Sequence, residues 1–201
     1  MGSKDHASIC MNRLFYWKGF IMIKAIATKY DGRFFRSRTE ARWAVFFNAI
    51  GIKYEYEKEG FKLEHGCYLP DFWLPEIDCW IEIKGEKPTE NENNLCSDLA
   101  FETKKRCFLF VGNPTITPDD GNNYTQNKYF TEQYGAIDEP YIFCACPDCG
   151  SMDIQWGGNW ERNEHEINCY YNPEHKEPKY RFVLNWFFDK AIETALSERF
   201  P

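Results

Sequence analysis

The chain has 201 residues, of which 43% are hydrophobic and 18% aromatic, and it carries a formal net charge of −7 at pH 7. This length suits one domain with a small appendage, and the apolar content is enough for a buried core. The acidic balance is not that of a general nucleic-acid binder, and no apolar run approaches the roughly 18 residues of a membrane span, so no membrane partner is expected.

Residues 1–21 are predicted to be an N-terminal extension. They lack the layout of a secretory signal, because Lys18 interrupts the apolar stretch "RLFYWKGFIMI" and no small-residue cleavage site follows it. The opening "MGS" is typical of a vector-derived start. Nine cysteines without a signal favour a reducing compartment, here the cytoplasm, in which clustered cysteines indicate metal and scattered ones pack.

The expected elements follow one another as helix, three strands, helix and strand, after an extended segment at 23–30. Ser37 as N-cap and Gly51 as a stop define the first helix. Thr89 is the expected cap of the second helix. A closing amphipathic helix is expected at 182–200. The predicted ranges are 37–51 (helix), 52–61, 67–74 and 78–85 (strands), 88–106 (helix) and 107–112 (a buried strand of the parallel type).

Basic residues gather at two places along the chain. Between positions 24 and 42 the chain has six basic and two acidic residues. This local excess of positive charge fits either a surface that contacts phosphates or an ordinary solvated surface. Three more end the second helix, where they can contact phosphates or complement the helix dipole. The first group is Lys24, Lys29, Arg33, Arg36, Arg38 and Arg42, and the second is Lys104, Lys105 and Arg106.

Three charged residues are expected to meet on neighbouring strands. In "CWIEIK" the side chains alternate, so Glu82 and Lys84 share the face opposite Ile83. Asp71 follows Pro70, which suits a kink or an edge, and strand pairing through a turn near 75–78 brings Asp71 toward Glu82. Two adjacent carboxylates repel each other unless a cation lies between them, and Mg²⁺ is a hard cation that oxygen ligands suit.

Pro70-Asp71, ten intervening residues and then Glu82-Ile83-Lys84 resemble the motif of the PD-(D/E)XK nuclease superfamily, which has the restriction-endonuclease-like fold. Glu40 takes the place of the glutamate that this superfamily often carries on the helix before the first strand. The resemblance covers about residues 30–112. It implies an α/β fold with an α-β-β-β-α-β core and a mixed central sheet.

The same resemblance implies a Mg²⁺-dependent deoxyribonuclease, with Mn²⁺ as an alternative ion. The metal would be bound by Asp71, Glu82, Glu40 and the carbonyl group of Ile83, and Lys84 would position or deprotonate the nucleophile. Bound metal orients a water molecule, lowers its pKa and neutralises the charge that develops on the phosphodiester. DNA is the expected partner, and RNA stays open.

Each of these residues also has an ordinary structural interpretation. Glu82 and Lys84 fit an exposed cross-strand pair, and Asp71 fits a turn. Glu40 fits a capping box with Ser37, so its capping and metal-binding roles both stay open. The alternative function is that of a non-catalytic nucleic-acid-binding or adaptor protein that keeps the nuclease fold.

A structural zinc site is predicted near the C-terminus. The stretch Cys146-Pro147-Asp148-Cys149-Gly150 has the shape of a knuckle in which two thiolates bind zinc. Cys169 and His175 are the expected second pair, and nineteen residues separate Cys149 from Cys169, a spacing typical of zinc ribbons. His165 and Cys144 are alternative ligands, and four protein ligands leave no open position for chemistry.

The predicted organisation is an extension over 1–21, a nuclease core over 22–140, and a zinc-ribbon-like module with the closing helix over 141–201. The C-terminal module is expected to stabilise its own part of the chain or to contact nucleic acid, because a segment with few aliphatic residues buries little by itself.

Overall fold

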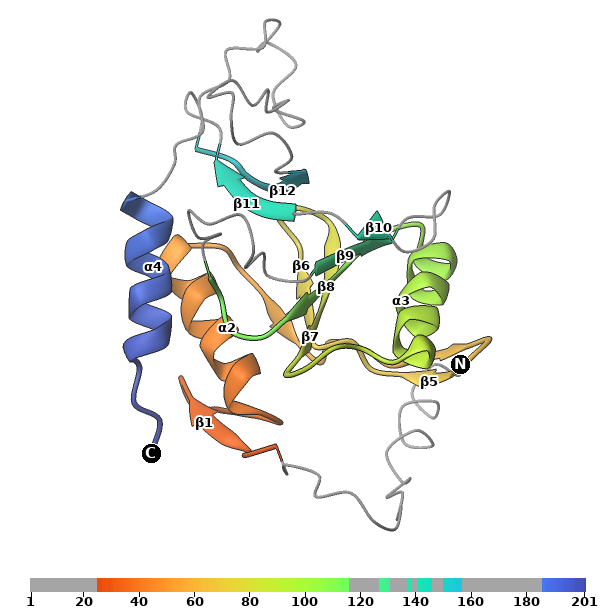
Figure 1. Ribbon diagram of the computed structural model, residues 1–201, viewed down its shortest axis with the longest axis horizontal. Helices are drawn as coiled ribbons and strands as arrows, with labels where there is room; N and C mark the ends of the chain where they lie inside the picture. Colours follow the sequence, from red (N-terminus) through yellow and green to blue (C-terminus); the bar gives the residue numbers. More distant parts are fainter. Residues whose placement is uncertain (1–24, 116–126, 131–136, 139–140, 146–149, 157–185) are drawn as a thin grey trace, which may run out of the picture.

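A mixed six-stranded sheet lies at the centre of the molecule, with helices on both of its faces (Figure 1). The computed structural model describes residues 25–115, 127–130, 137–138, 141–145, 150–156 and 186–201. The expected α/β class is confirmed. Within these ranges, no helix is long and apolar enough to cross a membrane. In spatial order the strands are β10 (Ile137–Asp138), β9 (Asn127–Phe130), β8 (Arg106–Val111), β7 (Cys79–Lys84), β6 (Phe72–Leu74) and β3 (Glu55–Tyr56).

The neighbours β7 and β8 form the parallel pair of this sheet. Their register runs from Cys79 opposite Arg106 to Lys84 opposite Val111. A parallel pair needs a crossover connection, which α3 (Glu90–Thr103) supplies. The other pairs in the sheet are antiparallel, so the sheet is mixed. The predicted strand at 78–85 and the predicted parallel strand at 107–112 are therefore confirmed.

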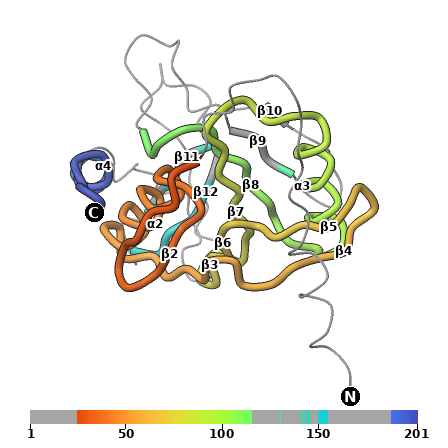
Figure 2. The backbone as a smooth tube through the Cα atoms, turned by 90° about the horizontal axis from the view of Figure 1, so that it is seen from below, coloured from red at the N-terminus to blue at the C-terminus, as the bar shows by residue number. Residues whose placement is uncertain are grey.

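The helix α2 (Arg38–Ile50) begins and ends where its sequence signals place it. The backbone of Ser37 is extended, and its hydroxyl accepts a hydrogen bond from the Glu40 amide at 3.1 Å. Gly51 ends the helix with a φ of 77°, a left-handed conformation that glycine adopts without steric cost. The last helix, α4 (Trp186–Ser197), lies beside α2 and confirms the expected closing helix (Figure 2).

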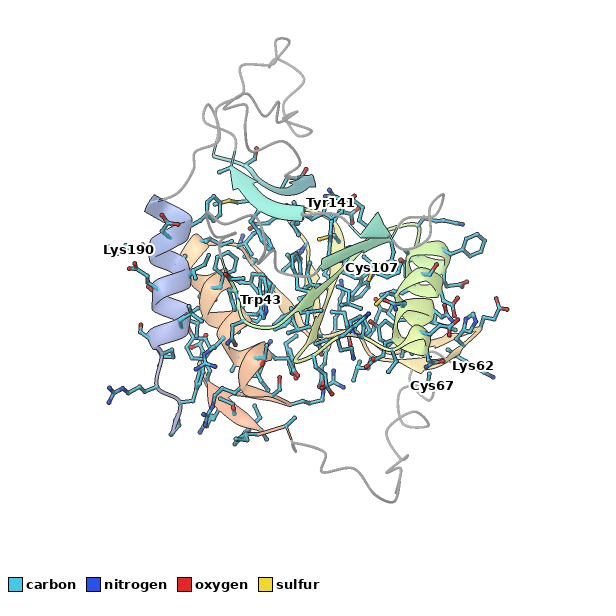
Figure 3. The ribbon with its side chains drawn as sticks, viewed as in Figure 1. Trp43, Lys62, Cys67, Cys107, Tyr141 and Lys190 are labelled. Atoms are coloured by element: carbon cyan, nitrogen blue, oxygen red, sulfur yellow. The ribbon has the colours of Figure 1, made fainter. Side chains whose placement is uncertain are left out.

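Side-chain alternation along β7 separates two layers of the core. Cys79, Ile81 and Ile83 pack with α2, whereas Trp80 packs with residues of α3. Figure 3 labels a residue of each layer, Trp43 on the α2 side and Cys107 on the α3 side. The α2 side is rich in aromatic rings that contact one another at angles typical of protein cores, among them Trp43, Phe46, Phe47, Phe72, Phe110 and Phe143.

Segments from the C-terminal third of the chain contribute to the same core. Ala145, Ile154 and Phe188 are buried in the layer that contains α2. The first two lie on a two-stranded antiparallel ribbon formed by β11 (Tyr141–Ala145) and β12 (Met152–Trp156). Among the described residues, this ribbon and α4 therefore share a hydrophobic layer with the residues of the predicted nuclease core.

The strands before β7 differ from those that were predicted. The expected strand at 52–61 is interrupted after β3, where Glu57 adopts a φ of 47°. The expected strand at 67–74 is split at residues 69–71, because Pro70 has no amide hydrogen for a ladder. A separate hairpin results, formed by β4 (Phe61–Leu63) and β5 (Gly66–Tyr68). A further hairpin, β1 (Thr28–Tyr30) with β2 (Arg33–Phe35), precedes α2.

The helix α3 begins at Thr89, as predicted, but ends earlier than predicted. Thr89 and Glu92 form a capping box at its start. Its last turn contains no basic residue, and Lys104 follows the helix with a φ of 58°. The expectation that Lys104, Lys105 and Arg106 lie in the last turn is therefore wrong, since the chain leaves the helix before it reaches them.

Candidate active site

Asp71 and Glu82 lie side by side where β6 and β7 begin to separate. The Asp71 amide donates to Glu82 Oε2 at 3.3 Å, and the Ile83 amide donates to Asp71 Oδ2 at 2.7 Å. The ladder between β6 and β7 ends with Phe72 opposite Ile81, and beyond it the Ile83 amide donates to the Asp71 carboxylate instead of to a backbone carbonyl of β6. The approach of Asp71 to Glu82 that strand pairing predicted is confirmed.

Both carboxylates are buried, which is costly for two like charges. Asp71 is 2% exposed and Glu82 is 3% exposed. Burial raises the pKa of Asp71 well above its ordinary value, and the neighbouring charges of Glu82 and Glu40 raise it further. The Arg36 guanidinium and the Ile83 amide act in the opposite direction. This is an environment in which an additional cation would relieve repulsion.

Arg36 covers Asp71 from the segment between β2 and α2. Its Nη2 atom lies 2.5 Å from Asp71 Oδ1, and its Nε atom lies 2.7 Å from Glu57 Oε1. Burial lowers the pKa of Arg36, but the charges of Asp71 and Glu57 outweigh this effect and raise it. The side chain is 53% exposed, so Arg36 lies between solvent and a buried carboxylate. In the sequence, Arg36 is one of six basic residues between positions 24 and 42, and no motif distinguishes it from the others.

Glu40 lies on the first turn of α2 and makes its contacts on that side. Its Oε1 atom accepts from the Ser37 hydroxyl at 2.7 Å, while Oε2 accepts from Tyr56 at 2.6 Å and from the Arg36 amide at 3.1 Å. Burial raises the pKa of Tyr56, and the hydrogen bond to Glu40 raises it further. Through these hydrogen bonds the Glu40 carboxylate stabilises the start of α2 and fixes the backbone of Arg36.

Lys84 lies between two carboxylates at the end of β7. Its Nζ atom is 2.8 Å from Glu82 Oε1 and 2.9 Å from Glu92 Oε1. Burial lowers the pKa of Lys84, but the charge of Glu82 and the hydrogen bonds to both glutamates outweigh it and raise the pKa. Burial raises the pKa of Glu92, but the hydrogen bond from Lys84 prevails and lowers it. Lys84 is therefore a firmly held cation.

Glu92 is a site residue that was not anticipated. Its second oxygen accepts from the amide and the hydroxyl of Thr89, which closes the capping box of α3. The same side chain therefore fixes the start of α3 and holds Lys84. A glutamate three residues after a threonine cap is visible in the sequence, and only a short loop separates it from the end of β7.

Two of the basic residues that follow α3, Lys105 and Arg106, pair with residues of the fold. Lys105 pairs with Asp78 at 2.6 Å. Arg106 pairs with the buried Asp153 at 2.8 Å and donates to the carbonyl groups of Ile77 and Ile154. These contacts tie β8 to the turn before β7 and to β12, so Lys105 and Arg106 serve the fold rather than a phosphate surface.

Asp71 and Glu82 are the pair of carboxylates that could hold a Mg²⁺ ion, whereas both oxygens of Glu40 accept hydrogen bonds from Ser37, Tyr56 and the Arg36 amide. In the described part of the chain, no group of three or more His, Cys, Asp and Glu side chains is placed to hold a metal ion together. Mg²⁺ keeps several of its waters and is often held by one or two carboxylates, so the buried Asp71–Glu82 pair suits it. The predicted zinc ligands Cys146, Cys149, Cys169 and His175, with the alternative His165, lie outside the described residues, and zinc binding stays a prediction.

We expect Glu40→Ala to lower the free energy of unfolding by about 2–3 kcal/mol. The change removes the acceptor of the Tyr56 and Ser37 hydroxyls, whereas the Arg36 amide keeps the Tyr56 hydroxyl as an acceptor at 3.0 Å. A buried donor that loses its acceptor costs about 1–3 kcal/mol. Glu40→Gln keeps one acceptor oxygen and should lose about 1 kcal/mol. Urea unfolding measures both, with the exposed Glu59→Ala as the control.

If the urea midpoint of unfolding of Glu40→Ala equals that of the wild type, Glu40 does not stabilise the start of α2 as proposed. The same variants separate the two interpretations of Glu40, because glutamine cannot supply a charged metal ligand. If Glu40→Gln binds Mg²⁺ as tightly as the wild type, capping and positioning are its only roles.

The site therefore consists of a buried carboxylate pair, one cation on each side of it, Glu57 and Glu92, which pair with those cations, and Glu40, which holds the backbone of Arg36. Its residues come from the segment before α2 and its first turn, from the residue after β3, from the β6–β7 pair and from the start of α3. No protein-family model, curated protein or solved structure matches the chain, so the inference of function rests on this geometry and on the motif that it contains.

Proposed function

We propose that this chain is a metal-dependent nuclease that hydrolyses phosphodiester bonds in DNA. The observation that carries the proposal is the buried Asp71–Glu82 pair on adjoining strands, with Lys84 two residues further along β7. A stabilising cross-strand contact would pair opposite charges, whereas here two carboxylates adjoin. The spacing and the strand context are those of the PD-(D/E)XK motif.

Asp71 and Glu82 would hold the ion, and the carbonyl group of Ile83 is a further ligand implied by the motif. Bound Mg²⁺ or Mn²⁺ would supply an activated water and neutralise charge on the phosphate. The Ile83 amide fixes the orientation of the Asp71 carboxylate, and Glu82 fixes the position of Lys84. The chain's own contribution is thus to hold two oxygen ligands and one cation at fixed positions.

Lys84 acts in this proposal as a positioning cation. Two carboxylates contact its ammonium group, so it retains its proton and is not the group that removes one from water. A firmly held ammonium group beside the carboxylates attracts a phosphate oxygen and keeps the scissile group in place. Glu92 maintains this position from α3.

A cleavage assay tests the proposal. Full-length protein is incubated with linear, circular, branched and single-stranded DNA in Mg²⁺, with EDTA as the control. Metal-dependent cleavage of any of these substrates supports a nuclease. Binding without cleavage supports the alternative, a non-catalytic nucleic-acid-binding protein, which the internal pairing of Asp71 with Arg36 and of Glu82 with Lys84 also suits.

We expect Arg36→Ala to bind Mg²⁺ about fivefold more tightly than the wild type. Arg36 neutralises Asp71 from its solvent side, and a partly exposed ion pair contributes on the order of 1 kcal/mol, which is about a fivefold change in affinity. Isothermal titration without DNA measures this affinity independently of any activity.

The matched control is Arg38→Ala, which removes the same charge from an exposed position two residues further along the chain. Equal Mg²⁺ affinity in Arg36→Ala and Arg38→Ala would show that Arg36 does not compete with the ion.

A further inference from the structure

The β1–β2 hairpin presents an exposed aromatic ring with a cation above it. Thr28 and Phe35 pair on its inner face and are buried, whereas Lys29 and Phe34 pair on the outer face. Phe34 is 69% exposed, and the Lys29 ammonium group lies 5.7 Å from the centre of its ring. A single exposed apolar side chain is ordinary on a protein surface, so the surroundings of the ring decide its meaning.

Those surroundings are basic, in contrast to the acidic chain as a whole. Between residues 25 and 42 the cations are Lys29, Arg33, Arg38 and Arg42, besides Arg36, whose charge is paired with Asp71 and Glu57. The acidic residues of this range are Asp31 and the buried, hydrogen-bonded Glu40. The whole chain carries a net charge of −7. The hairpin is therefore a local positive region, and positive regions on acidic proteins attract phosphates selectively.

A second exposed phenylalanine provides a comparison within the same molecule. Phe101 on α3 is 60% exposed, and the Lys104 ammonium group lies 4.1 Å from its ring centre. Its helix, however, carries Glu90, Glu92, Asp98 and Glu102 and no basic residue. The Phe34–Lys29 pair and the Phe101–Lys104 pair are thus similar in geometry but differ in the charge of their surroundings. The positive surroundings of Phe34 suit a polyanion.

The hairpin is also continuous with the candidate active site. Its second strand ends at Phe35, whose ring lies 4.5 Å from that of Tyr56 and 6.2 Å from that of Phe72. The next residue, Arg36, covers Asp71. The hairpin that carries Phe34 therefore leads along the chain to Arg36, the residue that separates Asp71 from solvent.

We propose that the β1–β2 hairpin binds single-stranded DNA, with one unpaired base stacked on Phe34 and adjacent phosphates contacted by Lys29, Arg33 and Arg38. Aromatic rings flanked by cations bind single strands in this manner, because every base has a π-face and every linkage a charge. A duplex does not offer the same contact, because its base faces are covered by their neighbours. This proposal rests on the proposed function and names the form of DNA that the site receives.

The test measures binding of the full-length chain to a fluorescent single-stranded oligonucleotide by anisotropy, in EDTA and at fixed salt. Phe34→Ala should weaken binding by about 5- to 100-fold, the range that one stacked base represents. Phe34→Trp should restore or tighten binding, because an indole ring stacks at least as well. Phe101→Ala, the matched control, should bind the oligonucleotide as tightly as the wild type does. The affinity for a blunt duplex should change little in Phe34→Ala.

Wild-type affinity in Phe34→Ala, or an equal loss in Phe101→Ala, would overturn the proposal. It would equally be overturned if Phe34→Ala abolished self-association in sedimentation while leaving DNA binding intact, because Phe34 would then contact a second copy. EDTA separates this test from cleavage. Phe34-dependent binding without any cleavage in Mg²⁺ refutes the proposed nuclease alone, and cleavage with Phe34-independent binding refutes the hairpin role alone.

Discussion

We expect Asp71→Asn, Glu82→Gln and Lys84→Met each to lower the rate of Mg²⁺-dependent DNA cleavage by about a thousandfold or more. Metal-assisted charge neutralisation is worth several kcal/mol, and each 1.36 kcal/mol is a factor of ten in rate. These substitutions keep the shape of the buried side chains, and the amide side chain in Asp71→Asn still offers an oxygen to the Ile83 amide. Single-turnover cleavage of a labelled DNA measures the loss.

Two comparisons make this prediction specific. Glu76→Ala removes an exposed carboxylate in the turn between β6 and β7, where it pairs with Lys53, and it should cleave at the wild-type rate. The double variant Asp71→Asn/Glu82→Gln should lose little beyond either single change, because residues that act as a unit are not additive. A variant that retains more than about a tenth of the activity would remove its residue from the proposed site.

Asp153→Ala should lower the free energy of unfolding by about 2–3 kcal/mol. The change leaves the Arg106 guanidinium without its carboxylate, and removing one partner of a buried ion pair costs about 3–5 kcal/mol. We expect the smaller value because the Arg106 side chain is 28% exposed. Asp153 also accepts from the Ile154 amide, which would lose its acceptor. Urea unfolding measures the change.

A double-mutant cycle separates the ion pair from simple loss of packing. Arg106→Met combined with Asp153→Ala should cost less than the sum of the single changes, because neither charge then remains unpaired. The exposed pair between Lys105 and Asp78 is the natural comparison, and removing it should cost less than about 1 kcal/mol. Strict additivity for Arg106 and Asp153 would show that their charges do not interact appreciably.

Local signals in the sequence were enough to predict both ends of α2, the start of α3 and the strands β7 and β8. Ser37 begins α2 because its side chain accepts a hydrogen bond from a free backbone amide of the first turn, and Thr89 does the same for α3. Gly51 ends α2 because its backbone amide bonds to carbonyl groups of the last turn. The strands before β7 were less predictable. Their limits depend on the left-handed backbone at Glu57 and on a hairpin that pairs with itself beside the sheet, and alternation alone does not indicate either.

The candidate site was predictable where it depends on strand geometry. Glu82 and Lys84 lie two residues apart on one strand, and Asp71 is brought near them by an antiparallel neighbour. Arg36 and Glu92 come from segments whose position depends on how the helices pack against the sheet. Each also had a local interpretation, as part of a basic run or as a helix cap, which concealed its contact with the site.

The close pairing of β6 with β7 has a consequence for the order in which the chain folds. Asp71 and Glu82 lie 11 positions apart, so little loop entropy opposes their meeting, whereas Arg36 lies 35 positions before Asp71. The strand pair can therefore form before Arg36 arrives. Lys84 pairs with Glu82 within β7, so the charge that lacks its cation until then is that of Asp71. We infer that the pair becomes fully stable only when the start of α2 docks, so two acidic side chains make these distant segments fold as one cooperative unit.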